Sequence, residues 1–156
     1  MARTATVGAR APSFSLPRDG GGKVSLADYG GRKLVLYFYP KADTTGCTRE
    51  ALDFSKLTPA FARAGTSIVG VSADPVAKLE KFKAKHGLLV ALGSDESHTA
   101  LSAYGVWAEK SMYGRRYMGA LRNTYLIVPD GRIAQIWEKV KVAGHAEAVL
   151  AAARAL

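Results

Sequence analysis

One cysteine stands in a setting that would make it a nucleophile. Cys47 is the single cysteine of the 156 residues, and it follows the apolar run 34–39, then Pro40, then a polar loop that ends in Gly46. A helical pattern begins at Cys47, so free N–H groups and the positive end of the helix dipole would point at its sulfur. Both effects stabilise the thiolate, the reactive form of a cysteine. Thr44 lies three residues earlier, where its hydroxyl could reach the same place.

A lone cysteine also has a plainer interpretation. In an intracellular protein it is often a small buried hydrophobic residue. It cannot form an internal disulfide, and it cannot build a cysteine-based zinc or iron–sulfur site. The strand, proline, loop and helix start together favour the nucleophile, because they place the cysteine at the carboxyl edge of a sheet, where open α/β folds hold their sites.

The elements that must position Cys47 alternate between strand and helix patterns. The expected strands are 14–16, 24–26, 34–39, 67–72, 89–92, 122–128 and 133–139, and the expected helices are 47–64, 75–87, 99–104 and 144–156. Asp74 and Pro75 are interpreted as the N-cap and first residue of the second helix, and Pro59 predicts a kink in the first. The last two strands flank the turn 129–132 and should pair antiparallel. This order predicts one domain, 1–156, with an α/β fold of thioredoxin-like type: a mixed central sheet, helices on both faces and an N-terminal β-hairpin.

The charge balance is strongly basic, with 22 Lys and Arg against 13 Asp and Glu and a net charge of +9. Such an excess could attract nucleic acid, an acidic protein or an anionic substrate. The densest group, Lys78, Lys81, Lys83 and Lys85, would cover more than one helix face. We therefore interpret it as a solvated surface and do not expect nucleic acid as a partner.

No apolar run approaches the roughly 20 residues that a membrane span needs, and residues 1–8 lack the hydrophobic stretch of a signal peptide. We expect a cytoplasmic protein without a membrane partner.

The spacing Pro40-x3-Thr44-x2-Cys47 resembles the active-site signature of the peroxiredoxins. The flanking residues 38–41 and 46–48 are similar to the bacterioferritin comigratory protein, or peroxiredoxin Q, branch of that family. Further similar segments are 8–14, 70–72 and 139–145. The resemblance extends over nearly the whole chain and implies a single peroxiredoxin domain of the AhpC/TSA type.

The resemblance implies a thiol-dependent peroxidase that needs no metal, haem or flavin. The Cys47 thiolate would attack hydrogen peroxide or an organic hydroperoxide, forming a sulfenic acid and releasing water or an alcohol. The family's donors for the developing negative charge correspond to the N–H groups around Gly46 and Cys47, the Thr44 hydroxyl and Arg122. These residues are the expected catalytic and substrate-binding groups.

The family also assigns roles to Pro40, which would shield the sulfur from water, and to Glu50, which would hold the arginine in place. The residues themselves leave other interpretations open. Arg122 could lie on a strand edge at the surface, Thr44 could be only an N-cap, and Pro40 could only end a strand. Tyr39 could line the pocket, although packing in the core explains it better.

The chain departs from the family pattern in two respects. Relatives carry a resolving cysteine in the first helix or the next one, and the matching residues here are Leu52 and Lys83. A chain with one cysteine must therefore be reduced by an external thiol: thioredoxin, glutaredoxin with glutathione, or a small thiol. Thr45 stands where this branch usually has proline, which could make the loop before Cys47 more mobile. By resemblance we expect a monomer, with a dimer left open.

The residues also allow two other functions. A thiol hydrolase or transferase would pair Cys47 with His86, His98 or His145 as base, but none has a supporting local spacing, and we expect all three histidines at the surface. A basic binding protein with a degenerate peroxiredoxin site would bind DNA in a salt-dependent manner without needing Cys47.

Overall fold

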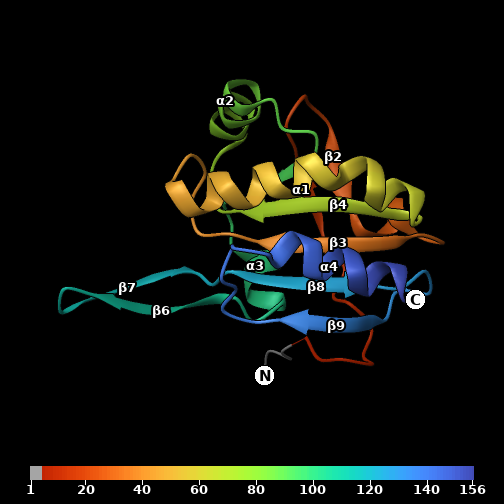
Figure 1. Cartoon of the computed structure of the whole chain (residues 1–156). Helices are drawn as coiled ribbons and strands as arrows, with labels where there is room; N and C mark the ends of the chain where they lie inside the picture. Colours follow the sequence, from red (N-terminus) through yellow and green to blue (C-terminus); the bar gives the residue numbers. More distant parts are fainter. Residues whose placement is uncertain (1–4) are drawn as a thin grey trace.

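A five-stranded mixed sheet lies at the centre of the computed structural model, which describes residues 5–156 (Figure 1). In spatial order its strands are β5 (Ala91–Ser94), β4 (Thr66–Ser72), β3 (Lys33–Phe38), β8 (Asn123–Ile127) and β9 (Ile133–Trp137). The first three are parallel, and β8 pairs antiparallel with both β3 and β9. The predicted mixed sheet and the antiparallel pairing of the last two strands are confirmed.

Helices cover both faces of this sheet, as the sequence predicted. The helices α1 (Thr45–Arg63), α2 (Val76–His86) and α4 (His145–Arg154) contribute side chains to the core on one face. The other face is covered by α3 (Thr99–Ala103) and by the expected N-terminal hairpin of β1 (Ser15–Pro17) and β2 (Lys23–Ser25), which a short 3₁₀ helix, η1 (Leu26–Tyr29), follows. None of the helices in the described part is both long and apolar enough to span a bilayer.

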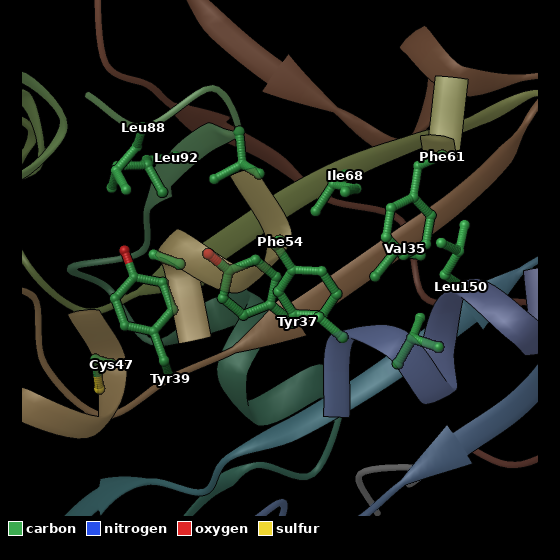
Figure 2. Close-up of a cluster of buried hydrophobic side chains, with 14 of the residues drawn as sticks. Val35, Tyr37, Tyr39, Cys47, Phe54, Phe61, Ile68, Leu88, Leu92 and Leu150 are labelled. Carbon is green, nitrogen blue, oxygen red and sulfur yellow. The ribbon is translucent and has the colours of Figure 1, made fainter. Parts of the chain in front are cut away.

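The central strand β3 carries the chain to the candidate site, and both of its faces are buried. Val35 and Tyr37 pack in one core, whereas Leu34 and Phe38 pack in the other. This explains the unbroken apolar run in the sequence, because a strand covered on both sides has no polar face. Figure 2 shows Tyr37 against Phe54 of α1, with stacked rings 4.7 Å apart.

One hairpin was not predicted. Strands β6 (Trp107–Met112) and β7 (Arg115–Ala120) pair antiparallel and project from the body of the molecule (Figure 1). Most of their side chains are exposed, so they lack the alternation of buried and polar residues by which strands are found in a sequence. The available signal in the sequence was Gly114, because glycine favours tight turns. In the structure Tyr113 and Gly114 both have positive φ, 53° and 76°, as a two-residue hairpin turn of type I′ requires.

The predicted cap of α2 is also corrected. The helix starts at Val76, with Pro75 in the N-cap position. The Asp74 carboxylate instead accepts hydrogen bonds from the Ala42 N–H (2.7 Å) and the Ser72 hydroxyl (2.8 Å). It therefore ties the loop after β3 to the end of β4. At Pro59, α1 continues as one helix to Arg63.

Candidate active site

Cys47 lies in the first turn of α1, at the edge of the core beside Tyr39 (Figure 2). The Thr48 N–H makes a helical hydrogen bond to the Thr44 carbonyl (2.8 Å). The N–H groups of Thr45, Gly46 and Cys47 therefore have no partner within the helix, since the residues four positions earlier lie outside it. Cys47 is only 1% exposed. Its sulfur thus lies in a largely water-free place beside unpaired donors, where negative charge is stabilised.

Arg122 reaches the sulfur from the start of β8. Its Nη2 donates to Cys47 Sγ at 3.3 Å, and its Nη1 donates to Glu50 Oε1 at 2.8 Å. The Val140 N–H bonds to the Arg122 carbonyl at 2.8 Å and fixes the backbone there. The structure thus brings Cys47, Arg122 and Glu50 together across 75 positions of sequence, and Arg122 does not lie on a free strand edge.

Gly46 makes this approach possible. A Cβ atom at this position would lie 3.2 Å from Arg122 Nη2 and 3.8 Å from Cζ, so any side chain would press on the guanidinium. The sequence predicted a role for Gly46 only through its N–H group. The need for an absent side chain was not visible in the sequence, because the arginine that fills the space comes from a distant strand.

Glu50 and Arg122, the ion pair beside the sulfur, differ in how firmly they keep their charge near neutral pH. Burial raises the pKa of Glu50 to about 7, because the attraction of Arg122 offsets only part of the cost of removing the carboxylate from water. Burial alone would lower the pKa of Arg122, but Cys47 and Glu50 together raise it above its usual range. The arginine therefore stays charged at every working pH, whereas Glu50 exchanges its proton near neutrality. Glu50 Oε2 is buried without a hydrogen-bond partner in the described part of the chain.

Pro40 and Thr44 line a cavity of about 490 Å³ next to this cluster. Thr44 occupies the N-cap position of α1, but its hydroxyl donates to the Lys41 carbonyl (2.7 Å) instead of capping the helix. Tyr39 is buried in the core and does not line this cavity. The opposite wall comes from the unpredicted hairpin and includes Lys110, a residue that the sequence analysis did not single out.

The three histidines do not share one environment. His86 contacts Asp43 (2.9 Å), and His98 stacks on Trp107. His145 is buried and bonded to Thr124 (2.8 Å), so its predicted surface position is wrong.

No local pattern indicated this burial, because His145 stands at the start of an alanine-rich helix, where polar residues are usually exposed. Burial, with a smaller effect from Arg122, lowers the pKa of His145 to about 4, so it is neutral at physiological pH. Within residues 5–156, no hydrogen bond joins any histidine to Cys47.

The two positions that correspond to a resolving cysteine hold residues without thiol chemistry. Leu52 is 41% exposed on α1. Lys83 pairs with Asp19 at 2.7 Å, and Lys78 and Lys85 also pair with aspartates. The dense lysine group of α2 is therefore largely occupied by ion pairs. Among the described residues, no three His, Cys, Asp or Glu side chains gather closely enough to hold a metal ion.

The chain matches known proteins over most of its length. Residues 7–136 match the AhpC/TSA family. The peroxiredoxin Bcp of Xanthomonas campestris pv. campestris is 48% identical over 147 residues, which cover 93% of this chain and 92% of that protein. The peroxiredoxin Bcp of Bacillus subtilis is 45% identical, with 91% and 90% covered.

Solved structures agree with the sequence comparison. Peroxiredoxin Q of X. campestris superposes with a TM-score of 0.87 at 47% identity, covering 91% of this chain and 90% of that one. A mutant of peroxiredoxin Q from Xylella fastidiosa gives a TM-score of 0.93 at 38% identity, with 98% of each chain covered. A further structure, 46% identical, belongs to work on the alkyl peroxide reduction activity of the X. campestris bacterioferritin comigratory protein.

The thioredoxin-like fold and the cysteine at the start of α1 define a thiol-based peroxidase. The chain belongs to the AhpC/TSA family. Within that family it is a peroxiredoxin of the Bcp and PrxQ type, with Cys47 as its single cysteine.

Proposed function

We propose that the Cys47 thiolate reduces hydrogen peroxide and organic hydroperoxides by direct attack on one peroxide oxygen. An S–O bond forms as the O–O bond breaks, and the leaving oxygen takes a proton and departs as water or an alcohol. The observation that carries this proposal is the Arg122 guanidinium, which bonds to the Cys47 sulfur and to Glu50 at the start of α1. A permanently charged, forked donor can hold the thiolate and then the leaving oxygen in the same place.

The neighbouring residues would complete the site. The N–H groups of Gly46 and Cys47 have no helical partner at the start of α1 and would donate to the negative charge that develops during the reaction. The Thr44 hydroxyl can exchange its bond to the Lys41 carbonyl for one to the peroxide. Pro40 has no N–H group and would keep water from the sulfur. Glu50 would act through Arg122 by fixing the plane of the guanidinium.

The sulfenic acid would be reduced by an external thiol. The needed chemistry can come from thioredoxin, from glutaredoxin with glutathione, or from small thiols. A thiolate attacks the oxidised sulfur, and a second thiol then breaks the mixed disulfide and releases Cys47. The alkyl peroxide work on the 46%-identical relative supports including organic hydroperoxides among the substrates. The resemblance to the same branch supports a monomer. A requirement for external thiols fits the reducing cytoplasm, where such thiols are abundant.

Replacement of the sulfur tests the proposal. Cys47→Ser should abolish peroxide turnover with dithiothreitol as reductant, whereas a matched Ser55→Ala variant of the same helix should keep it. Peroxidase activity retained in a clean preparation of Cys47→Ser would refute the proposal. DNA binding that is salt-dependent and survives this substitution would favour the basic binding protein instead.

A further inference from the structure

The proposed function requires that a thiol from outside the chain reach the oxidised Cys47. Cys47 is the single cysteine, so its sulfenic acid has no thiol within the chain, and the residue is only 1% exposed. A protein thiol can reach the sulfur only if the protein that carries it first binds beside the loop 40–46. The surface next to that loop should therefore show the features of a docking site.

The β6–β7 hairpin supplies such a surface. Met112, Tyr113, Tyr117 and Met118 are exposed, Tyr113 to 97%, and they make up four of the eight large apolar side chains exposed in the described part of the chain. Their concentration within seven consecutive positions is unusual for the surface of a monomer, on which single apolar residues are normally scattered. Figure 1 shows the hairpin extending from the end of the molecule at which α1 begins.

A groove connects this hairpin to the active site. We call it the hairpin groove; it is the cavity of about 490 Å³ that has Pro40, Thr44 and Pro75 on one side and Trp107, Lys110 and Met118 on the other. Two of these residues, Pro40 and Thr44, also belong to the proposed peroxide site. A partner seated in the hairpin groove would thus touch the loop that leads to Cys47.

The charge around the hairpin groove is positive. The hairpin carries Lys110, Arg115 and Arg116 against one acid, Glu109, whose contact with Arg116 is a loose, exposed pair at 3.7 Å. Gly119 leaves room for the Lys110 stem, since a Cβ there would lie 3.1 Å from the Lys110 Cδ. Burial and the charge of Arg122 both lower the pKa of Lys110, as expected of a cation held in an already positive region.

The one acid that lines the groove does not neutralise it. The Asp74 carboxylate is occupied by the Ala42 N–H, the Ser72 hydroxyl and Lys78 (3.4 Å). Among residues 5–156, Lys110 makes no ion pair, so the hairpin groove is an apolar surface that carries positive charge. It is complementary to a protein face that combines apolar side chains with carboxylates.

We propose that the hairpin groove is the docking site for an acidic dithiol protein that reduces the Cys47 sulfenic acid; this inference rests on the peroxidase function proposed above. One thiolate of the partner attacks the Cys47 sulfur, forming a mixed disulfide as the S–O bond breaks and hydroxide leaves as water. The partner's second thiol then attacks the partner's first sulfur in the mixed disulfide. Cys47 returns as thiolate, and the partner leaves with a disulfide.

The test separates the two half-reactions. Oxidation of Cys47 by one equivalent of hydrogen peroxide is followed in a single turnover, and reduction of the oxidised protein is then measured with dithiothreitol or with an acidic bacterial thioredoxin. One variant combines Arg115→Glu with Arg116→Glu, and a second combines Tyr117→Ser with Met118→Ser. The control combines Arg63→Glu with Arg154→Glu, which changes the net charge equally at exposed positions near the far ends of α1 and α4.

Both hairpin variants should lower kcat/KM for thioredoxin at least fivefold, while oxidation by peroxide and reduction by dithiothreitol stay within twofold of the wild type. The control should match the wild type in all three measurements. Added salt should slow reduction by thioredoxin in the wild type and have little effect with dithiothreitol, because surface charges are screened.

Three results would overturn the docking proposal. In the first, the hairpin variants react with thioredoxin as the wild type does. In the second, they lose the dithiothreitol reaction equally, which would make the hairpin a structural support. In the third, thioredoxin is no faster than dithiothreitol at equal thiol concentration, which would point to a small-thiol reductant. Failure of Cys47 to oxidise would be seen in the first half-reaction and would refute the peroxidase function itself.

Discussion

The substitution Gly46→Ala tests whether the position of Arg122 controls the reactivity of Cys47. The new Cβ would lie 3.2 Å from Arg122 Nη2, a contact so tight that the guanidinium must move by a few tenths of an ångström. The backbone should accept alanine, because Gly46 does not have the positive φ that favours glycine. Alanine is also the better helix former by about 0.5–1 kcal/mol, so folding should be unchanged or slightly favoured.

The substitution should weaken the attraction between the Arg122 guanidinium and the Cys47 thiolate. With an effective dielectric constant of about 20, unit charges attract by about 5 kcal/mol at the observed 3.3 Å, and a shift of roughly 0.4 Å removes about half a kcal/mol. Weakening a hydrogen bond between charged groups adds a loss on the order of 1 kcal/mol. A total of about 1–2 kcal/mol corresponds to a rate of peroxide attack that is lower by roughly 5- to 30-fold.

Two measurements check this estimate. Single-turnover oxidation of Cys47 by hydrogen peroxide gives the rate of peroxide attack, and the rate of Cys47 alkylation at one fixed pH reports the reactivity of the sulfur without peroxide. The matched control is Thr45→Ala, which changes the exposed neighbouring residue. The Gly46→Ala variant should be oxidised and alkylated more slowly, whereas the control should behave as the wild type. A properly folded Gly46→Ala protein with wild-type oxidation and alkylation would show that Arg122 does not control the sulfur.

Two further predictions concern charges around the site. Because the native pKa of Glu50 is raised to about 7 from 4.5, the native state binds the extra proton between these values, and stability should fall as pH rises through them, by about 3 kcal/mol in all. Glu50→Gln should flatten this dependence in urea unfolding at pH 5 and 8, and an unchanged pH slope would contradict it. Asp43 lies in the loop before Cys47 and pairs with Lys85 (3.0 Å) and His86 (2.9 Å). Asp43→Asn should raise amide hydrogen exchange over 41–48 about two- to fivefold, and exchange equal to the wild type would mean that these pairs do not hold the loop.

Local sequence signals predicted the elements that deliver Cys47. The apolar run of β3 and the helical pattern of α1 are strong signals, because burial of both faces of a strand and of one face of a helix leaves regular patterns. The turn before β9 was equally clear from residues 129–132. These strands and the position of Cys47 at the start of a helix could therefore be predicted from nearby residues.

Contacts between distant residues were beyond that kind of reasoning. Arg122 entered the predicted site only through a family resemblance, since no local pattern shows that a residue 75 positions away meets the sulfur. Asp74 has the residue type and position of a helix cap but bonds to Ala42 and Ser72. His145 likewise bonds to Thr124, which lies 21 positions earlier on β8. In each case the outcome depends on a tertiary contact that no local pattern shows.

The central claim is that Cys47 is the residue oxidised by peroxide. Intact-protein mass spectrometry after one equivalent of hydrogen peroxide, with dimedone present to trap sulfenic acid, tests it most directly. We predict rapid formation of a single adduct that maps to Cys47. Absence of an adduct within minutes, from folded and fully reduced protein, would contradict the claim and make Cys47 a structural thiol.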